Sequence, residues 1–76
     1  MNVERRGQIS KALALVIEAR CLIEQARDDE REYFDNMPES FQEGDRGQQA
    51  EAVVDALDDA ANGCEDIESH LETACE

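Results

Sequence analysis

The chain has 76 residues, three cysteines and a formal net charge of −13, from 20 acidic and 7 basic side chains. A chain of this length forms one domain with a small core, and its charge argues against direct binding to nucleic acid or to an anionic membrane. Three widely spaced cysteines are not a disulfide framework, and no apolar run reaches the roughly 20 residues of a membrane span, so we expect reduced thiols and a cytoplasmic location.

The first predicted element is a helix over about residues 3–36. Its apolar residues recur at heptad spacing, which is typical of helices that pack in coiled-coil fashion. One set of the predicted seam contains Ile9, Val16, Ile23 and Met37, interrupted only by Glu30. The other set contains Ala12, Ala19, Ala26 and Tyr33. Alanine in this seam would let a partner helix approach closely.

A connection over residues 37–45 is expected next. Pro38 biases the preceding residue away from helical angles and is expected to start a short turn. Gly44 permits a positive φ, and Asp45 is the expected N-cap of the following helix. We expect an aromatic plug at this end of the molecule, made by Tyr33, Phe34, Met37 and Phe41.

The second predicted helix covers about residues 46–75. Its predicted seam contains two sets, Ala50, Leu57, Cys64 and Leu71, and Val53, Ala60, Ile67 and Ala74. Asn62-Gly63 could break it and give a three-helix protein, but the unbroken heptad favours one continuous helix. The predicted fold is all-α: a single domain, 1–76, folded as an antiparallel two-helix hairpin of coiled-coil type.

Large apolar residues also lie outside the predicted seam, within ten residues of the first helix. They are Leu13, Leu15, Ile17 and Leu22. Clustered exposed apolar side chains mark interfaces, although scattered surface leucines are also ordinary. We therefore expect these residues to form an oligomer interface, and the simplest assembly is a homodimer that makes a four-helix bundle.

The sequence offers no catalytic constellation. His70 is the only histidine, and Cys64 is expected to point into the seam. Strong zinc sites need paired Cys or His ligands at short spacing, which this chain lacks. We expect no enzymatic activity, no cofactor and no metal.

Acidic residues are concentrated in the second half of the chain. Residues 1–27 carry five bases and three acids, whereas residues 28–76 carry two bases and seventeen acids. No Lys or Arg follows Gly47. Carboxylates at helical spacing form a rigid stripe that can occupy a basic groove made for nucleic acid. The predicted partner-binding face contains Glu51, Asp55, Asp58, Asp59, Glu65, Asp66 and Glu72. The alternative is a face that only keeps the protein soluble.

The connection resembles that of a group of small acidic proteins encoded by bacteriophages and prophages. The residues that carry the resemblance are Phe34, Asp35, Asn36, Pro38, Glu39, Gln42, Arg46 and Gly47. It covers about residues 30–61, and Asn62-Gly63-Cys64 departs from the acidic repeats usual in the group. The resemblance implies a helical hairpin of phage origin that acts in a bacterial host cell.

Together these features predict a non-catalytic phage accessory protein. We expect it to bind and inhibit a host protein that has a basic surface, such as a CRISPR effector or another nucleic-acid-handling protein, by mimicking DNA with its acidic helix. The alternative function is a structural or adaptor protein of the phage, which works through an apolar helix–helix interface.

Overall fold

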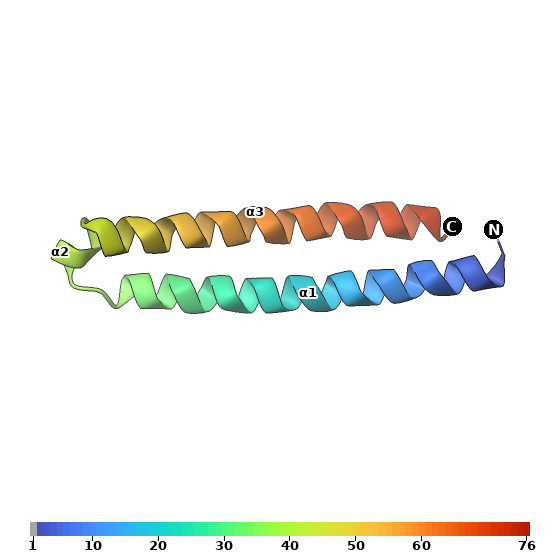
Figure 1. Ribbon diagram of the computed structural model, residues 1–76, viewed down its shortest axis with the longest axis horizontal. Coiled ribbons are helices and arrows are strands. Elements are labelled where there is room, and N and C mark those ends of the chain that lie inside the picture. Colours follow the sequence, from blue (N-terminus) through green and yellow to red (C-terminus); the bar gives the residue numbers. More distant parts are fainter. Residues whose placement is uncertain (1) are drawn as a thin grey trace.

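The protein is all-helical, as predicted. The computed structural model describes residues 2–76, and its helices are α1 (Val3–Asp35), α2 (Glu39–Gln42) and α3 (Asp45–Ala74). α1 and α3 run side by side in opposite directions, and both ends of the chain lie at the same end of the molecule (Figure 1). The molecule measures 58 × 14 × 13 Å. None of the described helices is long and apolar enough to cross a membrane.

The ends of α1 follow from local chemistry. The side chain of Asn2 accepts a hydrogen bond from the amide N of Arg5 at 2.8 Å, as expected of an N-cap residue. The helix ends at Asp35, shortly before Pro38. The carbonyl O of Pro38 then accepts from the amide N of Phe41 at 2.9 Å and of Gln42 at 3.1 Å, which starts the single turn of α2.

The start of α3 differs from the prediction. Its N-cap is Gly44, with a φ of −90°, so this glycine is not needed for a positive φ. Asp45 is instead the first residue of the helix, and no side chain caps it. A carboxylate in the first turn still stabilises the helix, because it lies near the positive end of the helix dipole.

The aromatic plug at the connection is only partly formed. Phe34 and Met37 are half-buried, whereas Tyr33 and Phe41 remain 52% and 51% exposed. The side-chain amide of Gln42 donates to the carbonyl O of Phe34 at 3.0 Å and so ties the connection to the end of α1.

Half of the predicted seam is wrong. The first set in each helix faces the other helix, but the second set does not: Ala19, Ala26 and Tyr33 of α1 are exposed, as are Val53 and Ile67 of α3. The residues that complete the contact lie one position further along the chain. In α1 they are Leu13, Arg20, Arg27 and Phe34. In α3 they are Gly47, Val54, Ala61 and Glu68, followed by the C-cap residue Cys75.

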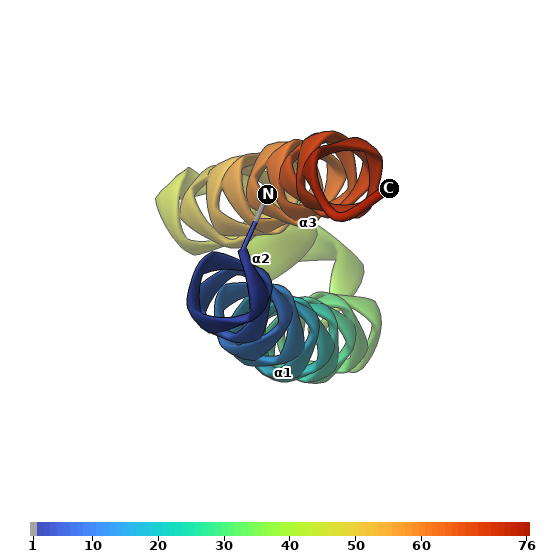
Figure 2. The ribbon, with the colours of Figure 1, turned by 90° about the vertical axis from the view of Figure 1, so that its right-hand side faces the viewer.

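The contact between α1 and α3 is therefore narrow and partly polar. The buried hydrophobic residues among those described are Ala50 and Ala61, each 2% exposed. Figure 2, a view along the long axis, shows that no further long helix within residues 2–76 covers either side of the pair. Both flanks of the helix pair are consequently open to solvent.

Candidate functional site

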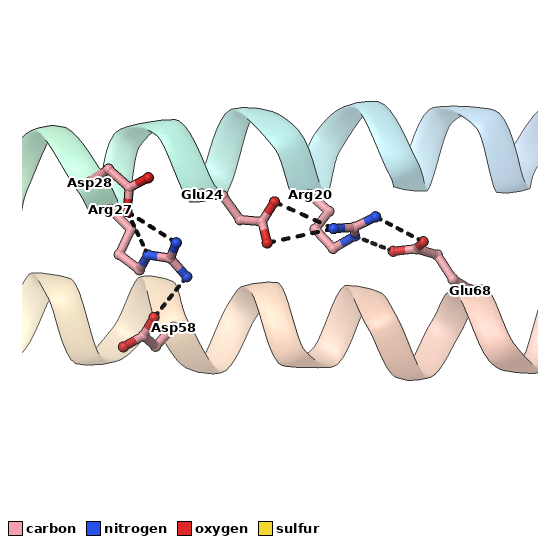
Figure 3. Close-up of polar contacts among 6 residues, drawn as sticks. All are labelled: Arg20, Glu24, Arg27, Asp28, Asp58 and Glu68. Atoms are coloured by element: carbon pink, nitrogen blue, oxygen red, sulfur yellow. Dashed lines mark hydrogen bonds and ion pairs between the residues drawn. The ribbon is translucent and has the colours of Figure 1, made fainter.

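Two arginines of α1 hold the helix pair together through carboxylates of α3 (Figure 3). Arg20 Nε lies 2.6 Å from Glu68 Oε2, and the same guanidinium contacts Glu24 on its own helix at 3.3 Å. Arg27 Nη1 lies 3.0 Å from Asp58 Oδ1. The hydrogen bond to Glu68 raises the pKa of Arg20 above its usual value, so this guanidinium is charged at every ordinary pH.

Arg27 is held from both helices. Its Nε and Nη2 donate to Asp28 Oδ1 at 3.1 and 3.0 Å, in addition to the bond to Asp58. Hydrogen bonds to Asp28 and then to Asp58 raise the pKa of Arg27. Arg31 adds a longer contact to Asp58, with 3.4 Å between Nη2 and Oδ2. Asp58 thus belongs to the bonds between the helices as well as to the acidic surface.

These contacts identify the two flanks of the helix pair. Arg31 and Asp58 meet on one flank, whereas Tyr33 and Arg46 line a shallow groove on the other. Residues seven apart on a helix lie on the same face. Any residue seven positions, or a multiple of seven, from one of these four therefore lies on the same flank. The flank of Arg31 and Asp58 carries Glu51, Asp55, Glu65 and Glu72 of α3. The flank of Tyr33 and Arg46 carries the exposed alanines Ala19, Ala26, Ala60 and Ala74.

The predicted acidic residues lie together along α3. We call the following set the acidic face: Glu51, Asp55, Asp58, Asp59, Glu65, Asp66 and Glu72. Six of the seven are exposed, and within residues 2–76 only Asp58 makes an ion pair. From Glu51 to Glu72 the face extends about 32 Å at a rise of about 1.5 Å per residue. Apart from Asp58, the carboxylates of this row form no ion pair with a base within residues 2–76.

A groove lies at the connection end of the acidic face. It has a volume of about 370 Å³. Three carboxylates line it, together with one arginine and two apolar side chains: Asp35, Glu51, Asp55, Arg31, Phe34 and Val54. Sequence reasoning missed this groove, because Asp35 and Phe34 come from α1 and the other carboxylates come from α3.

The predicted oligomer-interface residues do not lie together. Leu13 is half-buried in the contact with α3, which corrects its predicted place outside the seam. Leu15 and Leu22 are 56% and 61% exposed and share the flank of Tyr33. Ile17, 37% exposed, lies two heptads from Arg31 and so on the opposite flank. Sequence reasoning also missed Val53 and Ile67. It assigned them to the seam, but they are exposed on the same flank as Leu15 and Leu22.

The cysteines and the histidine are scattered. Cys21 is exposed, Cys64 and Cys75 are half-buried, and all three are free. Ser10 Oγ lies 3.8 Å from Cys75 Sγ. Among residues 2–76 no group of three or more His, Cys, Asp or Glu side chains is placed to hold a metal ion.

The acidic face and the open flank opposite it are the features from which a function can be argued. Comparison with protein-family models, with curated proteins and with solved structures finds no match for this chain.

Proposed function

We propose that the chain is a non-catalytic binding protein whose acidic face occupies a basic surface of a protein partner. The observation that carries this proposal is the segregation of charge. An ordinary solvated helix mixes signs and gains stability from pairs four residues apart, whereas α3 has no base after Arg46. The acidic face leaves six carboxylates without an ion pair in residues 2–76, available to a partner.

The chemistry of the face favours a partner that handles nucleic acid. Seven carboxylates along about 32 Å of rigid helix offer a row of negative charge comparable in scale to a nucleic acid strand. A groove built to bind phosphates attracts such a row, whereas nucleic acid itself repels it. The partner class is therefore a protein with a basic groove, and not DNA or RNA.

The groove at the connection end would anchor one basic side chain of the partner. Phe34 and Val54 supply an apolar floor for the methylene stem of a lysine or arginine. Asp35, Glu51 and Asp55 supply carboxylates for its charged end. A face that only solubilised the protein would not need an apolar floor among its carboxylates.

Phage origin, action in the cytoplasm of a bacterial host and inhibition of a defence complex such as a CRISPR effector are parts of the same proposal. They rest on the resemblance of residues 30–61 to acidic phage proteins. We also propose that the helix pair is a stable hairpin in solution that associates as a homodimer. The second candidate function, a structural or adaptor role, is favoured by the apolar residues exposed opposite the acidic face, at Leu15 and Leu22.

Neutralising the acidic face is expected to abolish capture of basic proteins from bacterial lysate. The test variant changes five exposed carboxylates that make no ion pair in residues 2–76, Glu51, Asp55, Glu65, Asp66 and Glu72, to Gln or Asn. Asp58 stays, because its loss would also weaken the bonds between the helices. Mass spectrometry of proteins captured at low and high salt is the measurement, and capture by the native chain should weaken with salt.

The matched control removes the same charge elsewhere. It changes five exposed glutamates of α1 and the connection, Glu4, Glu18, Glu32, Glu39 and Glu43, to Gln. Both variants lose five of the negative charges that give the native net charge of −13, so both carry −8. The proposal predicts that the control still captures nucleic-acid-binding proteins. Equal capture by both variants would show that the acidic face is not the binding surface.

A further inference from the structure

The flank opposite the acidic face carries no charge over most of its length. We define the uncharged face by the residues of this flank within 8–26 of α1 and 49–74 of α3; Arg5, Asp29 and Arg46 occupy the same heptad positions beyond these limits. In α1 the face contains Gln8, Ala12, Leu15, Ala19, Leu22 and Ala26, and in α3 it contains Gln49, Val53, Ala56, Ala60, Gly63, Ile67, His70 and Ala74. All are exposed except Ala12 and Gly63, which are half-buried. Counting His70 as neutral, no formal charge lies among fourteen positions of a chain whose net charge is −13.

Large and small side chains alternate on this face. In α1, alanines recur every seven residues, and Leu15 and Leu22 stand between them. In α3, Val53 and Ile67 are separated by a row of small residues, Ala56, Ala60 and Gly63. Alternation of this kind lets facing helices interdigitate, with large side chains of one surface entering the shallow places of the other. The face therefore has both the projections and the hollows that a second copy of itself would need.

The surface area of the chain leaves room for an interface of ordinary size. A compact protein of 8.5 kDa exposes about 4,700 Å² by the usual scaling, whereas this chain exposes 5550 Å². The excess is about 850 Å², close to the roughly 800 Å² that each partner buries in a standard interface. The two helices alone bury few side chains, and chains this small commonly need such a partner.

Charge decides which occupant fits. A second copy carries the same net charge of −13, so most of the surface repels it. Within residues 8–26 and 49–74, the uncharged face lets two such chains meet without opposing like charges. A strongly basic partner has no carboxylate to engage there and belongs instead on the acidic face.

We infer that two copies of this chain pack together through their uncharged faces, as a symmetric four-helix dimer. The inference rests on the proposed homodimer and identifies its surface, but it does not depend on the binding of a basic partner. In the dimer Leu15, Leu22, Val53 and Ile67 are buried, whereas Leu13 remains within each helix pair and Ile17 stays outside. Because the faces meet back to back, both acidic faces point outward on opposite sides, and one dimer can hold two basic partners.

Ala19→Arg tests the inference, and Ala14→Arg is its matched control. Both alanines are exposed in α1, and both variants add the same side chain and charge. Ala19 lies on the uncharged face, and Ala14 lies outside it. Sedimentation equilibrium of the native chain and of Ala14→Arg is expected to give a mass of about twice 8.5 kDa, and Ala19→Arg should give a single 8.5 kDa chain.

A second variant and its control, both on α3, test the inference if Ala19→Arg does not fold. Ala60→Arg, on the uncharged face, should give a monomer, and Ala52→Arg, outside it, should stay dimeric. Circular dichroism at the same concentrations reports whether each variant remains helical. A native chain that is monomeric at all concentrations tested would overturn the inference, as would folded dimers of Ala19→Arg and Ala60→Arg. None of these masses depends on a basic partner, so failure here is separate from failure of the acidic face to bind.

Discussion

Replacing Gly47 with alanine is expected to destabilise the protein by about 3 kcal/mol, at the upper end of the usual range for inserting an atom into a packed contact. A Cβ at Gly47 would lie 2.0 Å from the carbonyl O of Gln42 and 2.6 Å from its Cα. Those atoms belong to backbone, which cannot rotate away as a side chain can. The first turn of α3 would have to move away from α2, and the chain reversal would open. For a domain of this size the Tm should fall by roughly 12 to 24 °C.

α3 continues through Asn62 and Gly63 without a break. Gly7→Ala is the matched control for Gly47→Ala, because Gly7 lies within α1 outside the uncharged face, and a Cβ there would meet no atom within 4 Å. Since alanine favours helix over glycine by about 1 kcal/mol, this variant should raise the Tm. Thermal unfolding followed by circular dichroism measures both. If the two variants moved the Tm in the same direction, the close approach of Gly47 to Gln42 would not be the determinant of the reversal.

Arg20→Leu is expected to lower the Tm by several degrees, the largest loss among single replacements of the arginines. The variant leaves the carboxylate of Glu68, only 12% exposed, without its charged partner between the helices. Removing one member of a desolvated pair is damaging because the remaining charge is no longer compensated. Arg31→Leu is the control, since the Arg31 side chain is 50% exposed and its contact with Asp58 is longer. It should have little effect, as is usual for an exposed ion pair.

The double variant Arg20→Leu with Glu68→Leu should recover the stability of the native chain or exceed it. Both positions face the other helix, so two leucines would pack where the ion pair was. Thermal unfolding of the native chain, the two single variants and the double variant completes a double-mutant cycle. Additive effects of the two single changes would contradict a direct coupling between Arg20 and Glu68.

Arg20 and Arg27 also explain why the contact between the helices was predicted only in part. Apolar spacing identified one set of each seam correctly, because residues such as Ile9 and Leu71 have only polar residues on either side in the sequence. For the other set, either Ala19 or Arg20 could face the second helix, and the greater hydrophobicity of alanine predicts Ala19. The arginines face α3 because Glu68 and Asp58 lie opposite them. A pattern read from one helix at a time does not contain that pairing.

The two candidate surfaces were predictable from the sequence to different degrees. The acidic face followed from spacing alone, because carboxylates at helical intervals on one helix share a side wherever the partner helix lies. The uncharged face could not be predicted, because it consists of residues that do not contact the other helix, and those residues were assigned correctly only in part. The apolar side chains of Val53 and Ile67 predict core positions, but in the structure Ala61 and Glu68 face α1, and Val53 and Ile67 are exposed. The groove beside Phe34 needed the tertiary arrangement, because its walls come from both helices.

We propose that the helix pair carries two separate surfaces, one for a basic partner and one for a second copy of itself. Capture from bacterial lysate by three chains tests both: the native protein, Ala19→Arg, and the variant with Glu51, Asp55, Glu65, Asp66 and Glu72 neutralised. We expect Ala19→Arg to capture the same nucleic-acid-binding proteins as the native chain, and the neutralised variant to capture none of them. Loss of capture by a folded Ala19→Arg chain, or unchanged capture by the neutralised variant, would contradict the separation of the two surfaces.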